Sequence, residues 1–202
     1  MKVVVSPLPP LTDQVRIRER VQSDLPALQK VLVAQQPESG YPLRDPLTFP
    51  LDVFLHEGDA VKAWTADLAG EPVGHVCRTG PARKSREADL IADLCAQAYN
   101  CDVRDLTWVN SLFVAASARR LGIGRRLMST VVDDSLEAGL HPCLELLPTH
   151  PGALSLYLAT GWKVVERLRP EWLREIAGEE GADVHIMILA SQQNVGPSNN
   201  CN

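Results

Sequence analysis

The 202-residue sequence has no apolar run that approaches the roughly 20 residues of a membrane-spanning helix. Its first seven residues are also too few for the apolar core of a signal peptide. Neither sign of charge is in large excess, because the net charge is −5 and acidic and basic residues are interspersed. A broad electrostatic surface for nucleic acid or an anionic membrane is therefore excluded. We expect a cytoplasmic protein that binds neither nucleic acid nor membrane.

The sequence also lacks any paired cysteine spacing. Its five cysteines are Cys77, Cys95, Cys101, Cys143 and Cys201. An odd number argues against a closed disulfide framework. No Cys-x-x-Cys motif or neighbouring histidine pair accompanies these residues, so we expect reduced thiols and no metal site.

An apolar share of 45% excludes general disorder, and the length suits one domain. No internal repeat is present. We expect a leader over residues 1–14, one domain over residues 15–190 and a polar, disordered tail over residues 191–202.

Hydrophobic periodicity predicts alternating strands and helices within that domain. Strands are expected at residues 15–18, 60–67, 72–78, 106–114, 142–148, 162–168 and 184–189. Helices are expected at residues 24–36, 51–56, 123–139 and 151–160, with a helical insertion within residues 81–105. Ser23 and Asp24 are expected to cap the first helix, which would bury Leu25, Leu28, Leu32 and Val33. Prolines and glycines predict a loop over residues 37–50.

The most informative segment, residues 112–128, is predicted to form a buried strand, a basic turn and a helix that opens on glycines. Gly122 and Gly124 have no side chains, so backbone N–H groups there can lie directly against a ligand. The free amides of a helix's first turn attract anions. Positive charge is added around the turn by Arg119, Arg120, Arg125 and Arg126. The segment therefore predicts a phosphate site.

The spacing Arg119-x-x-Gly122-x-Gly124 resembles the acyl-CoA pyrophosphate loop of the GCN5-related N-acetyltransferase (GNAT) superfamily. It lacks the Gly-Lys-Ser/Thr of a Walker loop and is one glycine short of a dinucleotide fingerprint. A second block, residues 150–162, is similar to the family's Asn-x-x-Ala-x-x-x-Tyr-x-x-x-Gly-Phe segment. In this block His150 replaces the asparagine and Trp162 replaces the phenylalanine.

The resemblance implies an α/β fold of the α+β mixed kind. Its sheet would be mostly antiparallel, with about seven strands, a splayed central pair and flanking helices. Acetyl-CoA would lie in the splay, and an amine would attack its thioester directly. The residues implied to bind the cofactor are Leu112, Phe113, Val114, Arg119, Leu121, Gly122, Ile123, Gly124, Arg125, His150, Ala153 and Tyr157.

The resemblance also implies catalytic residues. Tyr157 aligns with the family tyrosine that protonates the departing CoA thiolate. Asn110 lies where relatives often carry a glutamate or histidine base, and an amide has no basic function. We expect Asn110 to orient a water molecule or the amine. The base is then Glu145, His75, a water relay, or no group at all if the amine arrives neutral.

The acceptor pocket is expected to involve Tyr41, Trp108 and Asn110. We favour an enzyme that acetylates the primary amine of a small molecule. One alternative is a protein or peptide N-acetyltransferase. Another is a regulatory module that binds acyl-CoA without transfer, suggested by the amide at Asn110. The apolar strand at residues 184–189 would permit a homodimer.

Overall fold

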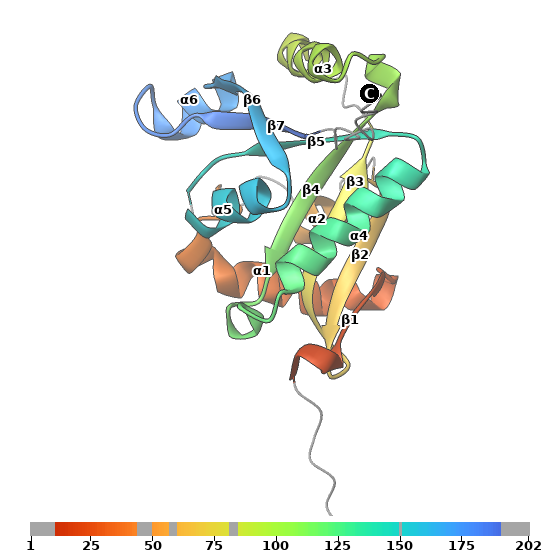
Figure 1. Ribbon diagram of the computed structural model, residues 1–202. Helices are drawn as coiled ribbons and strands as arrows, with labels where there is room; N and C mark the ends of the chain where they lie inside the picture. The colour runs from red at the N-terminus through yellow and green to blue at the C-terminus, as the bar shows by residue number, and fades with distance from the viewer. Residues whose placement is uncertain (1–10, 44–49, 57–59, 81–84, 150, 191–202) are drawn as a thin grey trace, which may run out of the picture.

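The computed structural model describes residues 11–43, 50–56, 60–80, 85–149 and 151–190. A seven-stranded sheet runs through the molecule in the order β1-β2-β3-β4-β5-β7-β6 (Figure 1). Every neighbouring pair of strands is antiparallel except β4 and β5, which are parallel. The mixed, mostly antiparallel sheet expected from the sequence is confirmed. The strands are β1 (Val15–Glu19), β2 (Ala60–Leu68), β3 (Glu71–Thr79), β4 (Leu106–Val114), β5 (His141–Leu146), β6 (Trp162–Leu168) and β7 (Val184–Leu189).

Helices cover both faces of this sheet. In Figure 1, α4 and α5 lie in front of the strands, α1 and α2 lie behind them, and α3 lies at the upper end. The helices are α1 (Leu25–Ser39), α2 (Leu51–His56), α3 (Arg86–Tyr99), α4 (Ile123–Glu137), α5 (Pro151–Ala159) and α6 (Glu171–Ala177). Short 3₁₀ turns are η1 (Leu11–Gln14), η2 (Gln22–Asp24), η3 (Val103–Asp105) and η4 (Ala116–Ala118).

Side chains that alternate along the strands divide the core into three clusters. On β4, Val109 packs into the cluster beneath α4 and α5, whereas the preceding Trp108 packs into the cluster beneath α3. We call these the α4 cluster and the α3 cluster. Farther along β4, Phe113 joins a third set with α1 and α2, the α1 cluster, whose other buried members are Leu25, Leu28, Leu32 and Leu55.

Helix α4 lies close to β3 because Gly74 has no side chain. A Cβ atom at Gly74 would lie 3.1 Å from the carbonyl oxygen of Phe113 and 3.2 Å from Leu127 Cδ1. Both distances are shorter than ordinary van der Waals contact. The glycine therefore permits the close packing that places the N-terminal end of α4 beside the end of β4.

Most elements lie where periodicity predicted them, with three differences. Helix α1 continues through Pro37 to Ser39, although a loop was expected from residue 37. Pro37 has no N–H to donate to the Val33 carbonyl oxygen, and the helix ends two residues later, where Gly40 adopts φ 65°. Val33 is exposed, so the prediction that it is buried was wrong. Helix α6 was not predicted; Pro170 at its N-cap was the available signal.

Asp24 directly precedes α1. The prediction that its side chain caps this helix was wrong, because the carboxylate makes no capping hydrogen bond. The buried carboxylate accepts two hydrogen bonds from Arg18, at 2.7 and 2.8 Å. It also accepts from the backbone N–H of Val21 and the hydroxyl of Thr65, each at 2.9 Å. The hydrogen bond from Arg18 is the main reason that the pKa of Asp24 falls to about 2. Asp24 therefore joins β1, β2 and the start of α1.

We expect Asp24→Asn to lower the free energy of unfolding by about 3–5 kcal/mol, because it leaves a partly buried guanidinium without its main partner. Urea unfolding monitored by circular dichroism at pH 7 measures this loss. In the wild type, the free energy of unfolding should also decrease as the pH falls from the ordinary aspartate pKa near 4 to about 2. The folded state holds the Asp24 carboxylate in its ionised form more strongly than the unfolded state does, and this advantage is lost as the carboxylate becomes protonated.

The control is Glu19→Gln, since Glu19 also forms an ion pair but its side chain is 68% exposed. This variant should change the free energy of unfolding by less than about 1 kcal/mol. Equal effects of the two substitutions would contradict a special role for Asp24.

Candidate functional site

The two central strands, β4 and β5, pair over only three positions. The paired residues are Leu106 with His141, Thr107 with Pro142, and Trp108 with Cys143. Beyond this point β4 continues beside β3, and β5 continues beside β7. An opening between β4 and β5 therefore begins after Trp108 and Cys143, as the expected splay requires.

A bulge in β4 lines this opening. On β3, His75 pairs with Phe113 and Cys77 pairs with Asn110, so two β4 residues, Ser111 and Leu112, lie opposite one residue of β3. Ser111 has a left-handed backbone conformation, with φ 54°. A bulge of this kind reorients the backbone groups of the strand. Here it changes the direction of the peptide groups beside the opening.

The loop that starts α4 lies at the end of β4. The first helical hydrogen bond of α4 runs from Arg126 N to Gly122 O, so the N–H groups of residues 122–125 have no acceptor within the helix. Gly122, at φ 74°, allows the tight turn. A Cβ atom on Gly124 would lie 3.4 Å from Leu156 Cδ2 and 4.0 Å from Val114 Cγ2. The glycine loop, the end of β4 and α5 therefore converge.

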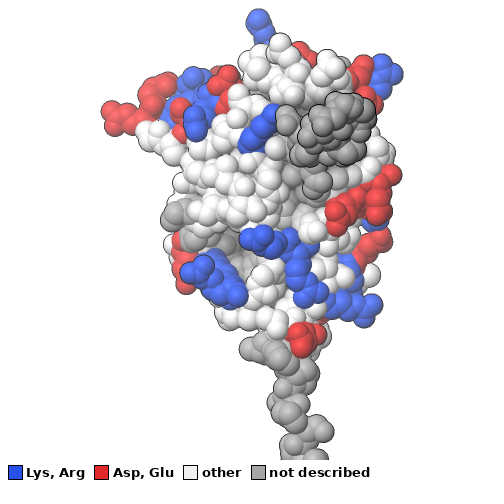
Figure 2. Space-filling model, in the orientation of Figure 1, with Lys and Arg blue, Asp and Glu red and all other residues white. Residues whose placement is uncertain are grey.

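Basic side chains surround this loop. Figure 2 shows them gathered on the face that carries α4, near its N-terminal end. Arg120, Arg125 and Arg126 are exposed. Arg119, in contrast, forms an ion pair with Glu38 of α1 at 2.8 Å, so it ties the loop to α1. The free amides and the exposed guanidinium groups together suit a phosphate-bearing ligand.

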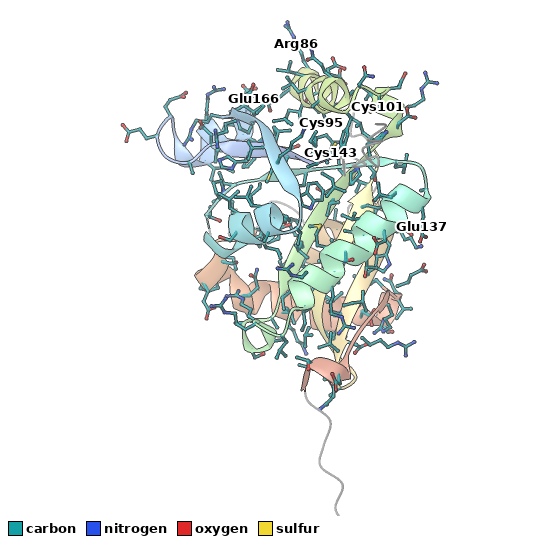
Figure 3. All side chains as sticks on the ribbon, viewed as in Figure 1. Arg86, Cys95, Cys101, Glu137, Cys143 and Glu166 are labelled. Carbon is teal, nitrogen blue, oxygen red and sulfur yellow. The ribbon has the colours of Figure 1, made fainter. Side chains whose placement is uncertain are left out.

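Helix α3 lies on the face of the sheet opposite to α4, where it packs against Trp108 and Cys143, the last paired residues before the opening. Cys95 of α3 and Cys143 of β5 are both fully buried in the α3 cluster, and the partly buried Cys101 packs against it (Figure 3). None of these three cysteines forms a disulfide. Within the described ranges, no three metal-ligating side chains come together, and no helix has the length and apolar character to cross a membrane.

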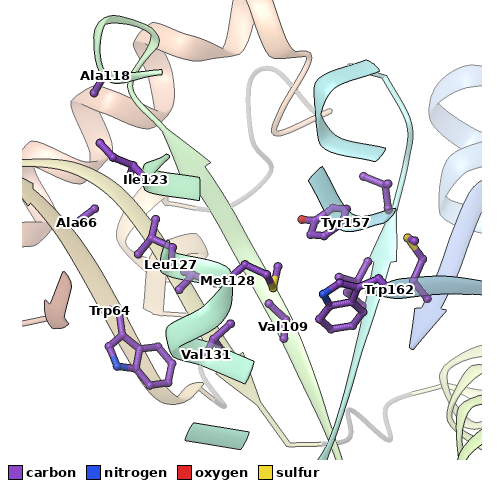
Figure 4. Close-up of a cluster of buried hydrophobic side chains, with 14 of the residues drawn as sticks. Trp64, Ala66, Val109, Ala118, Ile123, Leu127, Met128, Val131, Tyr157 and Trp162 are labelled. Carbon is purple, nitrogen blue, oxygen red and sulfur yellow. The ribbon is translucent and has the colours of Figure 1, made fainter. Parts of the chain in front are cut away.

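Tyr157 projects from α5 toward β4 (Figure 4). Its ring packs edge-on against Trp162, with centroids 6.2 Å apart, and only 9% of the residue is exposed. Burial raises the pKa of the phenol above its ordinary value. The hydroxyl therefore keeps its proton at neutral pH and can donate it on the α4 side of the opening.

Glu145 and Asn110 lie on the other side of the opening. Each is two residues beyond the last paired position, Trp108 and Cys143, so each points to the face of the α3 cluster. The Asn110 amide donates to Thr79 Oγ1 at 2.9 Å. Glu145 is exposed to solvent, but nearby protein atoms partly desolvate its carboxyl group. That desolvation, with a smaller contribution from the Glu87 carboxylate, raises the pKa of Glu145 to about 6.

The residues predicted to bind the acceptor are placed apart. Trp108 is buried in the α3 cluster, with 7% exposed. Tyr41 packs against Phe54 of α2, with ring centroids 5.8 Å apart. Leu43, two residues farther on, contacts the α3 cluster, so the segment after α1 reaches the face that carries Glu145. His150 lies outside the described residues.

His75, one of the candidate bases, is fully buried on β3. Its Nδ1 lies 3.0 Å from the Ser111 carbonyl oxygen, and its Nε2 lies 3.0 Å from Arg20 Nη1. Desolvation is the main cause that lowers the pKa of His75 to about 4. Because both ring nitrogens are engaged, His75 is not placed to take a proton from a substrate. Sequence reasoning missed Arg20, because it belongs to no motif and only the fold brings it to His75.

A model of the acetyltransferase (GNAT) family matches residues 25–162. No curated protein matches the chain. Among solved structures, yncA of Salmonella typhimurium, determined with its cofactor acetyl-CoA, is similar at 17% identity and a TM-score of 0.63. The match covers 93% of this chain and 99% of yncA.

Two further solved structures are similar as well. NAA60 of Arabidopsis thaliana, in complex with a bisubstrate analogue, is 21% identical with a TM-score of 0.61, over 86% of this chain and 96% of that chain. The ribosomal-protein-S18-alanine N-acetyltransferase of Escherichia coli is 15% identical with a TM-score of 0.57, over 90% and 99%. At these identities the likeness shows a common fold.

Proposed function

The chain belongs to the acetyltransferase (GNAT) family, and from that premise we propose that it transfers the acetyl group of acetyl-CoA to the primary amine of a small molecule. The observation that carries the proposal is the opening between β4 and β5 beside the glycine loop of α4. A strand edge, free amides and exposed arginines thus meet where an elongated, phosphate-bearing thioester can bind.

The residues around the opening fit acetyl-CoA. Gly124 leaves space that even a methyl group would narrow, because its Cβ position lies 3.4 Å from Leu156. We assign the pyrophosphate to the N–H groups of residues 121–125 and the pantetheine arm to the backbone of Leu112 and Val114. Acetyl-CoA supplies a thioester carbonyl that an amine attacks, and the protein has to hold it and move two protons.

The two proton-transfer roles are assigned to opposite sides of the opening. Tyr157 Oη, on the α4 side, keeps a proton at neutral pH and donates it toward the leaving sulfur. A carboxylate oxygen of Glu145, on the α3 side, accepts a proton from the amine as its nitrogen loses basicity during attack. Asn110 orients the amine or a water molecule beside Glu145. This arrangement separates the incoming nitrogen from the leaving sulfur.

A small acceptor is favoured by what surrounds Glu145. The Glu87 carboxylate of α3 acts on Glu145 electrostatically and also accepts a hydrogen bond from the backbone N–H of Glu171 in α6, at 3.3 Å. Helices α3 and α6 therefore approach each other beside the opening, and their carboxylates attract a cationic amine. A protein or peptide amine is the second candidate, in keeping with the fold shared with the ribosomal-protein-S18-alanine N-acetyltransferase.

Calorimetric titration with acetyl-CoA, followed by a thiol-release assay over small amines, amino acids and peptides, tests the proposal. We expect a dissociation constant in the micromolar range and acceptor-dependent thiol release. Preference for peptides would move the assignment to a protein N-acetyltransferase. Binding without release for any amine would favour the regulatory module, and no binding by the folded protein would refute the acetyltransferase.

We expect Tyr157→Phe to lower kcat by about 10- to 100-fold, as the loss of one hydrogen bond to a charged leaving group predicts. The dissociation constant of acetyl-CoA should stay within about threefold of the wild type, because the ring remains. Steady-state thiol release and calorimetry measure the two quantities. Unchanged turnover would remove Tyr157 from the reaction.

The matched control is Tyr99→Phe. The Tyr99 hydroxyl donates to Pro142 O at 2.6 Å and accepts from Leu189 N at 2.8 Å, far from the glycine loop. Its removal should lower the free energy of unfolding by about 1–3 kcal/mol while kcat is retained. Equal losses of kcat in both variants would point to a general structural effect.

A further inference from the structure

A chain of hydrogen bonds that runs from the partly buried Arg20 through the fully buried His75 reaches the bulge of β4 from the side away from the opening. Arg20, just after β1, donates to the backbone carbonyl of Leu55 at α2 and lies 3.0 Å from His75 Nε2. His75 Nδ1 in turn lies 3.0 Å from Ser111 O. The His75 ring also stacks on Phe113, with centroids 5.5 Å apart and planes at 29°. The Arg20 side chain and strand β4 thus hold the His75 ring in place.

The partners of His75 determine which of its nitrogens carries the proton. A guanidinium group has only donors, so Nε2 must accept the hydrogen bond from Arg20. Nδ1 then carries the proton and donates it to the carbonyl oxygen of Ser111. Arg20 therefore selects the tautomer of His75 that can hold the bulge.

The Ser111 carbonyl belongs to the same planar peptide unit as the N–H of Leu112. In a trans peptide these two groups point in opposite directions. A carbonyl drawn toward His75 on β3 therefore directs the Leu112 N–H away from β3, toward the opening beside β4. Ser111 has the left-handed φ of 54° that this orientation requires, which a serine rarely adopts without support.

We propose that His75, held by Arg20, is a positioning residue that fixes the Ser111–Leu112 peptide so that the Leu112 N–H faces the thioester carbonyl oxygen. This inference rests on the proposed acetyl transfer and adds a residue to it. A fixed N–H group at this place stabilises the negative charge that develops on that oxygen. Because the donor is held before the substrate arrives, little reorganisation is needed during the reaction.

Two substitutions at His75 separate positioning from packing. His75→Leu fills the site but donates no hydrogen bond, whereas the amide of His75→Asn places a donor near the position of Nδ1. We expect His75→Leu to lower kcat by about 10²- to 10³-fold. The dissociation constant of CoA, which has no acetyl carbonyl, should stay within about threefold of the wild type. His75→Asn should recover at least about tenfold of the lost kcat.

Full activity in His75→Leu would overturn the inference, as would an equal loss of kcat in both variants. A parallel loss of CoA affinity in His75→Leu would likewise assign His75 to binding or to the fold. Thermal unfolding of each variant shows that the protein measured is folded.

A binding measurement by NMR, which does not require acetyl transfer, keeps this test distinct from that of the proposed function. The ¹⁵N–¹H resonance of Leu112 should shift more on addition of acetyl-CoA than on addition of CoA, and His75→Leu should abolish that difference. If the wild type transfers acetyl groups but the difference survives in His75→Leu, only the inference fails. If the wild type releases no thiol with any amine, the proposed function fails, while the resonance still reports whether His75 orients Leu112.

Discussion

Replacing Gly124 with tryptophan raises the dissociation constant of acetyl-CoA by at least about a hundredfold, equivalent to about 2.7 kcal/mol. The Cβ of a new side chain lies 3.4 Å from Leu156 and 4.0 Å from Val114. An indole at this position therefore takes up space where the glycine loop, the end of β4 and α5 converge. Gly124 has an ordinary helical backbone, so the substitution blocks the loop without requiring a left-handed residue. Isothermal titration calorimetry measures the change.

The control places the same bulk on the same helix. Ser129 is exposed on α4, beyond the glycine loop, so Ser129→Trp should bind acetyl-CoA within about threefold of the wild type. Circular dichroism of both variants checks that α4 is intact. Full binding by a folded Gly124→Trp protein would show that the ligand does not use this loop.

Replacing Glu145 with glutamine is expected to lower kcat about a thousandfold, within the range for removal of a general base. Glutamine keeps the size and the hydrogen-bonding oxygen of the side chain but cannot accept a proton. The dissociation constant of acetyl-CoA should change little, because Glu145 lies on the face opposite to Tyr157 and α4. Steady-state thiol release with the acceptor found in the screen measures the loss.

The pH profile gives an independent readout for Glu145. A base has to be ionised, and desolvation holds the pKa of Glu145 at about 6, so wild-type kcat/KM should fall as the pH decreases through about 6. The residual activity of Glu145→Gln should lack this acidic limb. Glu166→Gln, on the exposed side of β6, should keep both the rate and the limb. An acidic limb that persists in Glu145→Gln would assign the titration to another group.

Local patterns were sufficient for much of this protein. Each strand repeats its contacts every two residues and each helix every 3.6, so apolar spacing predicted all seven strands and most helices. The glycine turn before α4 was also readable, because Gly122 adopts a left-handed φ of 74° that favours glycine. The failures at Pro37 and Val33 concern a helix end and a helix face, where tertiary contacts outweigh propensity.

Contacts between distant segments decided the remaining features. Sequence patterns left Glu145 and His75 as alternative bases, and the fold separates them: Glu145 is accessible to solvent, whereas His75 is fully buried with both ring nitrogens engaged. Arg20 reaches His75 across 55 residues, so no local window contains this pair. Asp24 also accepts a hydrogen bond from Thr65, 41 residues away, whereas a helix cap is a local expectation. Short-range spacing thus specified the elements and the glycine turn before α4, while the partners of buried charged and polar groups depended on the assembled fold.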